Sequence, residues 1–186
     1  MVCLMKEDMA VALLSERLAL ACCYNSSMAK LVKWAARFHD VGKTEVPQAI
    51  LNKPGKLLDC EFQIMKQHTK HGERLLSSVQ GERGAVAVEV ALKHHEWHNG
   101  QGYWGYEGME IPMFVGIVSV CDVYVALCSR RSYKKAWPPY KALQYIKNRA
   151  GTQFCPKVVR NFVSVVGDND RQTLNANIFS EYAEIR

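Results

Sequence analysis

Histidine and aspartate side chains that could bind metal ions lie in four separate stretches of this 186-residue sequence. The candidates are His39, Asp40, His68, His94, His95 and Asp122. Mixed imidazole and carboxylate ligands suit transition metals, and one carboxylate can bridge two ions. Asp122 lies inside the apolar run IVSVCDVYVAL, where an ionised side chain needs a cation, an arginine partner or a bound proton. The group as a whole predicts a site for two transition metals.

Each of these residues also has an ordinary explanation when it is considered alone. His39 could lie at an exposed helix end, where an imidazolium ion interacts favourably with the helix dipole. Asp122 could pair with an arginine from elsewhere in the chain. The adjacent His94 and His95 point about 100° apart on a helix. Both therefore reach one ion only if the helix end frays, or if two ions are present.

The remaining histidines differ in their expected exposure. His68 follows Met65 by three residues and precedes Leu75 by seven, so it falls on the apolar side of a predicted helix and we expect it to face the core. We expect His71, on the same helix, and His98, in the loop that follows HHEW, to face solvent.

Basic residues form a second candidate site in RRSYKKAW, residues 130–137. Arg131 and Lys134 in this stretch, and Lys43 three residues after Asp40, could hold phosphate oxygens. A solvated basic turn is the alternative explanation. The sequence contains no P-loop, no Rossmann glycine pattern and no GxSxG motif, which excludes the usual signatures of several enzyme classes.

Composition predicts a single globular domain that spans residues 1–186. The chain has a net charge of +6, and its seven cysteines include no CxxC pair, which argues against a disulfide framework or a zinc ribbon. The apolar run at 113–128 is too short to cross a membrane, and the N-terminus has no signal-peptide pattern. We therefore expect a cytoplasmic protein with no membrane partner and no nucleic acid polymer as partner.

The hydrophobic periodicity predicts an all-α fold, a compact bundle of about seven helices. The expected helices cover 7–23, 26–38, 59–78, 85–97, 113–128, 138–151 and 156–167. The valine content of 85–97 leaves a strand possible, and residues 98–112 are expected to form a glycine-rich loop. Serines at the start of 26–38 and Asp59 are the predicted N-caps, and Gly42 is the predicted terminator of the second helix.

The motifs together resemble those of the HD-GYP domain. HDVGK, ILNKPGKL, MKQHTKHGERLL, HHEWHNGQGYW, DVYVAL, RRSYKKAW and GTQFCP occur in that family's order and approximate spacing, over about residues 10–166, with 167–186 as a C-terminal tail. The resemblance implies a helical HD-domain bundle with a centre of two or three metals, often iron or manganese. It also implies hydrolysis of cyclic di-GMP, or of 3′,3′-cyclic GMP-AMP, to a linear dinucleotide by a metal-activated water.

The resemblance assigns roles to individual residues. The metal ligands would be His39, Asp40, His68, His94, His95 and Asp122, with Asp40 as the bridging carboxylate. Lys43 would lie near the scissile phosphate, and Arg131 and Lys134 would hold substrate phosphate. Gly102 and Tyr103 belong to the GYP-like loop, which would contact the substrate and, as a further possibility, a signalling protein of the diguanylate cyclase type.

Departures from the family pattern limit what the resemblance implies. Leu14 stands where the family has a metal-binding histidine, and Ala10 stands where three-metal members have a glutamate. Neither side chain can bind a metal, so we expect two ions and no third. Further departures are Asn99, Trp104, Val125 and Cys155. The alternative hypothesis is a catalytically impaired module that binds a cyclic dinucleotide or a signalling protein without turnover.

Overall fold

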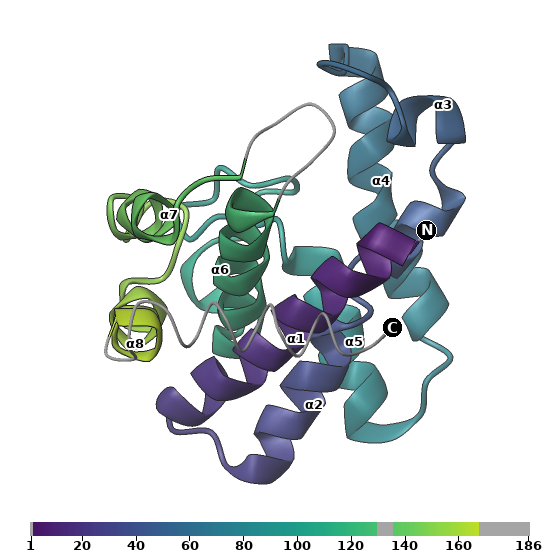
Figure 1. Cartoon of the computed structure of the whole chain (residues 1–186). Coiled ribbons are helices and arrows are strands. Elements are labelled where there is room, and N and C mark those ends of the chain that lie inside the picture. The colour runs from purple at the N-terminus through teal and green to yellow at the C-terminus, as the bar shows by residue number, and fades with distance from the viewer. Residues whose placement is uncertain (1, 130–135, 168–186) are drawn as a thin grey trace.

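The computed structural model describes residues 2–129 and 136–167, with side chains from Glu7 onward (Figure 1). Within these ranges the regular structure is helical, and the β-structure consists of two isolated bridges, Asn99–Glu107 and Ala150–Phe154. The α-helices are α1 (Val2–Ala21), α2 (Ser26–Ala36), α3 (Gln48–Leu51), α4 (Asp59–Leu76), α5 (Gly81–Lys93), α6 (Met113–Cys128), α7 (Pro139–Lys147) and α8 (Pro156–Gly167). Two 3-10 helices, η1 (Val41–Glu45) and η2 (Gly108–Glu110), complete the described secondary structure. The all-α prediction is confirmed.

The described helices differ from the prediction in number and in their ends. Eight α-helices are present instead of about seven, because the short α3 forms after Pro47. Residues 85–97 were predicted as a helix or a strand, and residues 85–93 belong to a helix that begins at Gly81 and ends at Lys93. The second helix ends at Ala36, well before Gly42.

Both predicted N-caps lie one position too late in the chain. Asn25 caps α2, because its side-chain oxygen accepts a hydrogen bond from the Met28 amide at 2.8 Å. Leu58 is the N-cap of α4, where its amide donates to the Glu61 carboxylate at 2.7 Å. A capping side chain accepts a hydrogen bond from an amide two or three residues later, which Asn25 does and the apolar Leu58 cannot do. The residue type indicates a cap, but the exact residue depends on where the helical backbone begins.

Helix α6 lies at the centre of the fold. Figure 1 shows α7 and α8 on one side of it, whereas α1 crosses it and α4 lies farther out on the other side. Most of α6 is buried, including Ile117, Val118, Val120 and Cys121, as expected for a helix that is apolar around most of its circumference. No helix in the described part of the chain is long and apolar enough to span a membrane.

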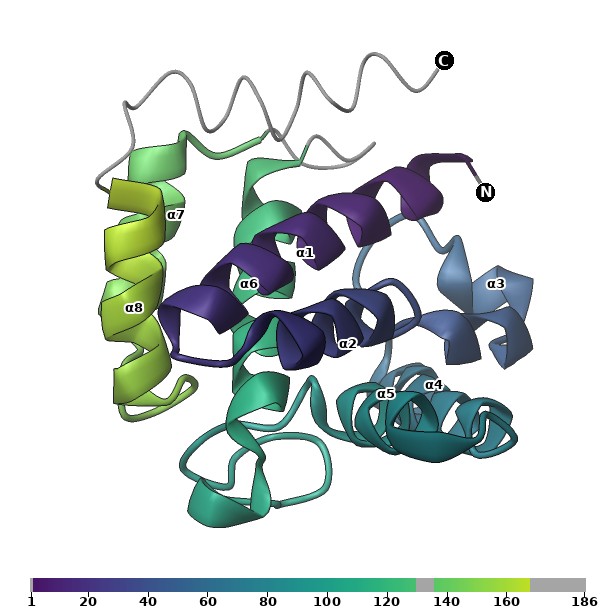
Figure 2. The ribbon, with the colours of Figure 1, turned by 90° about the horizontal axis from the view of Figure 1, so that it is seen from below.

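Helices α4 and α5 form a pair that carries three of the candidate ligands, and η1 packs against α4 (Figure 2). The close approach of η1 depends on Gly42. A Cβ atom at this position would overlap the carbonyl oxygen of His68 and would lie 2.5 Å from the amide nitrogen of Gly72. The absence of a side chain at Gly42 therefore brings Asp40, just before η1, up to His68.

Candidate metal centre

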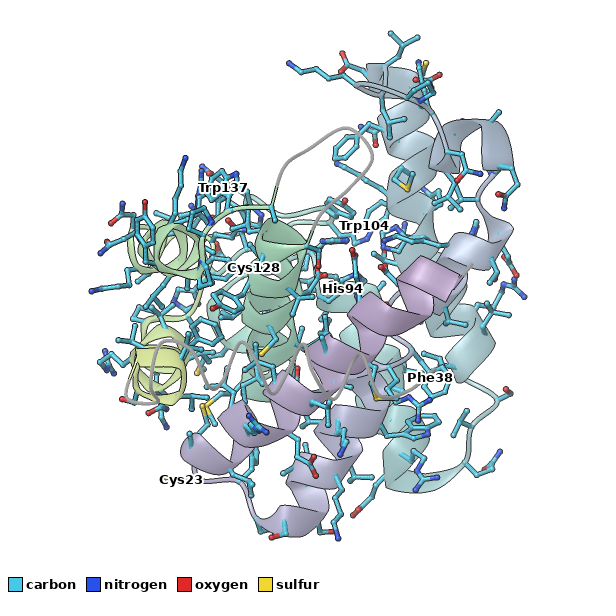
Figure 3. All side chains as sticks on the ribbon, in the orientation of Figure 1. Cys23, Phe38, His94, Trp104, Cys128 and Trp137 are labelled. Atoms are coloured by element: carbon cyan, nitrogen blue, oxygen red, sulfur yellow. The ribbon has the colours of Figure 1, made fainter. Side chains whose placement is uncertain are left out.

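The six predicted ligands converge in the interior, where α1, α4, α5 and α6 meet. Figure 3 shows His94 at this meeting point. His39 and Asp40 lie between α2 and η1, His68 is on α4, and Asp122 is on α6. His94 is the C-cap of α5, and His95 follows it. The helix ends at Lys93, just before this pair, and the centroids of the two rings are 4.1 Å apart.

His68, His94 and His95 form one side of the centre, which we call the imidazole half. Each of these rings offers a nitrogen in a group that also includes a carboxylate oxygen of Asp40, with all ligand atoms within 4.8 Å of one another. Asp40 Oδ1 is 3.3 Å from His68 Nε2 and 3.6 Å from His94 Nε2. One carboxylate therefore faces the donor nitrogens of two helices.

Backbone carbonyls fix the orientation of three histidine rings. Nδ1 of His39 lies 2.6 Å from the Ala36 carbonyl, and Nδ1 of His68 lies 2.7 Å from the Met65 carbonyl. Nδ1 of His94 lies 3.0 Å from two carbonyls of its own helix. A carbonyl only accepts, so Nδ1 carries the proton and donates, which leaves the lone pair of a neutral ring on Nε2. This arrangement is typical of metal-binding histidines.

The Nε2 atoms point toward the interior of the centre. His68 Nε2 and His94 Nε2 are 3.4 Å apart, and two lone pairs at that distance repel unless a cation lies near both. His39 Nε2 and Asp40 Oδ1 are buried and have no hydrogen-bond partner. Buried polar atoms without partners are rare in folded proteins. The donor set therefore fits divalent transition-metal ions, which take imidazole nitrogen and carboxylate oxygen.

His39 and Asp122, together with Asp8 of α1, form the other side of the centre, which we call the carboxylate half. His39 Nε2 is 3.4 Å from Asp40 Oδ2 and 3.7 Å from Asp122 Oδ1. Asp8 offers a carboxylate oxygen within 4.8 Å of ligand atoms of both His39 and Asp40. Asp40 thus lies between the two halves.

The histidine pKa values shift in opposite directions in the two halves. In the imidazole half, burial lowers the pKa of His94 and lowers that of His95 well below its ordinary value. Both rings are therefore neutral at pH 7, which is the form that binds metal. In the carboxylate half, burial also opposes the charged form of His39, but Asp40 and Asp122 outweigh it and raise its pKa well above the ordinary value.

The carboxylates respond to the same surroundings. Burial opposes ionisation of Asp40, but Lys43 and His39 outweigh it and hold the pKa of Asp40 well below its usual range. The pKa of Asp122 is also lowered, because the neighbouring His39 outweighs burial. Asp8 differs, since burial raises its pKa to about 6. Two of the three carboxylates are thus held ionised by cationic neighbours, and the third is not.

Residues at the edge of the centre include one predicted catalytic residue and one predicted substrate contact. The ammonium group of Lys43 forms an ion pair with Asp40 Oδ2. The ring of Tyr103 lies 4.6 Å from that of His95, centroid to centroid, and packs edge-on against Phe62 at 5.7 Å. Lys66 Nζ lies 5.3 Å from both the Phe62 and the Tyr103 ring centroids. An aromatic surface with a cation therefore borders the imidazole half.

The GYP-like loop is folded around a buried carboxylate, that of Glu96. The Glu96 side chain accepts hydrogen bonds from the amides of Trp104 at 2.8 Å, Gly105 at 3.0 Å and Tyr106 at 3.2 Å. Gly102 lies so close that a Cβ atom there would be 2.5 Å from Glu96 Cα. In the described structure Gly102 therefore allows the loop to pack on Glu96, and Glu96 holds Tyr103 next to His95.

Other predicted residues lie away from the centre or outside the described ranges. Arg131 and Lys134 fall in residues 130–135, which lie outside the described residues. Leu14 and Ala10 are fully buried members of the apolar core. The expectation that His71 faces solvent is wrong, because its side chain is only one-third exposed and Nδ1 is 3.6 Å from Glu45.

His98 is also only partly exposed, and its amide donates to the Gln153 carbonyl at 3.1 Å. The expectation that His98 is solvated therefore needs the same correction. The loop that contains it packs against the segment before α8.

Sequence reasoning missed Asp8 and Glu96. Glu96 stands between His95 and Trp97 in the polar stretch KHHEWHNG, so the sequence gives no signal that its carboxylate is buried. Asp8 gives no such signal either, because it lies in the polar stretch KED at the start of the helix. Its proximity to His39 comes from the tertiary packing of α1.

Comparison with known proteins identifies relatives of this chain. The family profile of the HD domain matches residues 2–158. The cyclic di-GMP phosphodiesterase response regulator RpfG of Xanthomonas campestris pv. campestris is 42% identical over 131 residues, which are 70% of this chain and 35% of that protein. The 3′3′-cGAMP-specific phosphodiesterase 2 of Vibrio cholerae is 39% identical over 150 residues, which are 80% of this chain and 29% of the relative. This chain thus spans about a third of the length of these relatives.

Solved structures share the fold at lower identity. The V. cholerae cyclic GMP-AMP phosphodiesterase V-cGAP3 superposes with a TM-score of 0.68 at 16% identity, covering 92% of this chain and 48% of that one. The HD domain of the L. monocytogenes phosphodiesterase PgpH, in complex with cyclic-di-AMP, superposes with a TM-score of 0.64 at 21% identity, covering 94% and 91%. At these identities the likeness establishes the helical fold.

Proposed function

This chain belongs to the HD domain family, with the motifs of the HD-GYP branch, and from that premise we propose that it is a metal-dependent phosphodiesterase. The substrate is a cyclic dinucleotide, cyclic di-GMP or 3′,3′-cyclic GMP-AMP, and the product is the linear dinucleotide. The observation that carries the proposal is the convergence of the Nε2 atoms of His68 and His94 on the carboxylate of Asp40, whose Oδ1 is buried without a hydrogen bond.

The residues of the two halves would hold two divalent ions. His68, His94 and His95 would bind one ion, and His39 and Asp122 would bind the other, with Asp40 shared. When bound, the ions would supply a water molecule of lowered pKa as the nucleophile at neutral pH. The mixed nitrogen and oxygen donors suit iron or manganese, and we propose these as the resident metals.

The chain itself provides charge and orientation around the reacting phosphate. Lys43, beside Asp40, keeps that carboxylate ionised and holds a positive charge at the edge of the centre. A fixed cation there would stabilise the negative charge that develops on the phosphoryl oxygens during attack. In the hydrolysis, the water oxygen forms a bond to phosphorus, and the bond from phosphorus to a ribose oxygen breaks. That ribose oxygen takes a proton.

The aromatic surface beside the imidazole half suits a nucleobase. A base could stack on the rings of Tyr103 and Phe62, since side-chain stacking accepts bases of any sequence. Lys66, which lies over both rings, would attract a phosphate. Arg131 and Lys134 remain predicted phosphate contacts.

We also propose a partner, a location and a domain organisation for this chain. A signalling protein of the diguanylate cyclase type would bind at the GYP-like loop, near which Met109 is fully exposed. The location would be cytoplasmic. The chain would act as a single domain over residues 1–186.

A hydrolysis assay with both dinucleotides tests the function. The full chain is prepared without a metal-affinity tag and is loaded with Mn²⁺ or, under anaerobic conditions, with Fe²⁺. We expect linear dinucleotide from wild type and none from Asp40→Ala. The control is His98→Ala, which removes a histidine from the same motif but outside the centre.

The alternative hypothesis predicts a different result. A module that binds without turnover would retain a cyclic dinucleotide in equilibrium dialysis, yet would give no linear product with any of these metals. That combination would overturn the enzyme proposal.

A further inference from the structure

Asp8 is the residue in the centre that neither the motifs nor the family resemblance assigns. Its carboxylate oxygen lies within 4.8 Å of ligand atoms of His39 and Asp40. The side chain is partly buried, and the charged groups that face it are His39, Asp40, Lys43 and Asp122. Asp8 thus lies in the carboxylate half and not on the outer surface of α1.

The second observation is the unpartnered nitrogen of His39. The His39 side chain is 1% exposed, and its Nε2 has no hydrogen bond even though carboxylate oxygens surround it. Nδ1 is already engaged by the Ala36 carbonyl, so Nε2 is the atom with which His39 can bind a ligand. A buried imidazole nitrogen among carboxylates is suited to a cation, a proton or a divalent metal ion, since an apolar ligand would leave the charges unpaired.

The first helix cannot supply a ligand at the positions where related domains have one. Leu14 and Ala10 are fully buried in the apolar core and carry no donor atom. Asp8 lies on the same helix, two residues before Ala10. Its carboxylate would therefore provide α1 with a donor from a different position.

We infer that Asp8 is a metal ligand of this chain, which completes the shell of the ion in the carboxylate half together with His39, Asp40 and Asp122. The inference rests on the proposed metal centre. It makes the two halves chemically unequal. The carboxylate half offers one nitrogen and three carboxylates, one of them shared, and suits a hard ion such as Mn²⁺. The imidazole half offers three nitrogens and the shared carboxylate.

Binding of Mn²⁺ to the metal-free full chain tests the role of Asp8 without reference to activity. The loss of the EPR signal of free Mn²⁺ measures the binding. We expect wild type to bind two ions. Asp8→Asn, which keeps the shape and removes the charge, should bind one ion normally and the other at least about tenfold more weakly. Asp8→Glu should retain both ions.

A matched control is Glu16→Gln, which makes the same chemical change on the same helix. Glu16 pairs with Lys33 at 2.6 Å, outside the centre, and its loss should leave both ions bound. Circular dichroism establishes that each variant is folded.

The outcomes separate this inference from the proposed function. Two ions bound by Asp8→Asn with wild-type affinity, or equal weakening in Glu16→Gln, would overturn the role of Asp8. Loss of both ions from folded Asp8→Asn would overturn its assignment to one half. Wild type that binds no metal would overturn the proposed function and this inference together. Wild type that binds two ions without hydrolysing either dinucleotide would overturn the function alone and leave the role of Asp8 supported.

Discussion

The imidazole half and the carboxylate half of the candidate centre share Asp40 but are built by different means. The imidazole half comes from two neighbouring helices, and backbone carbonyls of those helices fix the rings of His68 and His94. The carboxylate half gathers Asp8, His39 and Asp122 from three segments far apart in the sequence, on α1, after α2 and on α6. One half depends on local helix geometry, and the other depends on the packing of the whole bundle.

This difference has a chemical consequence. Burial keeps His94 and His95 neutral and ready to bind a metal, because it outweighs the effect of the nearby carboxylates. The carboxylate half concentrates negative charge, which stabilises the protonated form of His39 when no metal is bound. We expect the imidazole half to bind its ion with less dependence on pH. The carboxylate half must release a proton before His39 can bind a metal, so its affinity should fall as the pH falls.

The largest expected effect comes from removing one half by His94→Ala. The variant should lose one ion per chain and more than about 100-fold in hydrolysis, because loss of a ligand costs more than loss of the groups that support it. The remaining ion should bind in the carboxylate half, whose ligands are unchanged. Titration of the metal-free variant with Mn²⁺ measures how many ions it binds.

The control for this experiment is again His98→Ala, which should stay within about twofold of wild type because His98 is not among the residues whose ligand atoms gather at the centre. The comparison between the halves would break down if His94→Ala retained two ions, or if it lost both.

A second, smaller effect should come from the backbone contact that joins the halves. Gly42→Ala places a methyl group where the His68 carbonyl oxygen lies, so η1 must move away from α4. Forced overpacking of this kind typically costs about 1–3 kcal/mol. Asp40 would move away from His68, and we expect weaker binding in both halves at once. Urea unfolding and Mn²⁺ titration measure the two consequences.

Gly116→Ala is the matched control, since a Cβ atom there meets Val158 at an ordinary 3.7 Å. Replacing a helical glycine where space allows should stabilise the fold by about 0.5–1 kcal/mol. Equal behaviour of the two variants would contradict the role given to the close contact at Gly42.

The same contrast explains how much the sequence could predict. The histidines of the imidazole half were predictable, because short motifs place them and periodicity puts His68 on the apolar side of its helix. Asp122 was predictable because a carboxylate in an apolar run needs a partner. Asp8 was not, since its position depends on how α1 crosses the bundle. The spacing of apolar residues along a single helix contains no information about how that helix crosses the others.

Errors in the predicted local structure have a similar origin. The N-caps are Asn25, which is as good a capping type as the neighbouring serine, and Leu58, which is not a capping type, so residue type alone did not locate either helix start. Gly42 was noticed for its type but was given the role of a helix terminator. Its φ angle is not positive, and the reason for glycine there is the carbonyl of another helix. Such a contact between segments 26 residues apart leaves no local pattern.

The smallest expected effect, on the stability of the metal-free protein, distinguishes Asp8 from its neighbours. Burial raises the pKa of Asp8 to about 6 in the folded protein, from an ordinary value of 3.8. The folded state therefore binds a proton more tightly than the unfolded state, and stability contributed by this group falls as the pH rises from about 4 to about 6. Asp8→Asn has no carboxyl group at this position, so the variant does not lose this stability as the pH rises. We expect the metal-free variant to match wild type near pH 4, and to be more stable at pH 8 by about 1–2 kcal/mol, a value reduced for the partial exposure of the side chain.

Thermal or urea unfolding with a chelator present, at pH 4 and at pH 8, measures the difference. Glu16→Gln should show no gain at pH 8, because that carboxylate has a lysine partner. A constant difference between Asp8→Asn and wild type at both pH values would mean that the substitution acts through packing and not through charge. A gain at pH 8 alone would show that the Asp8 carboxylate destabilises the metal-free fold. Such a cost is expected of a residue whose negative charge serves to bind a cation, since functional groups often lower the stability of the fold that holds them.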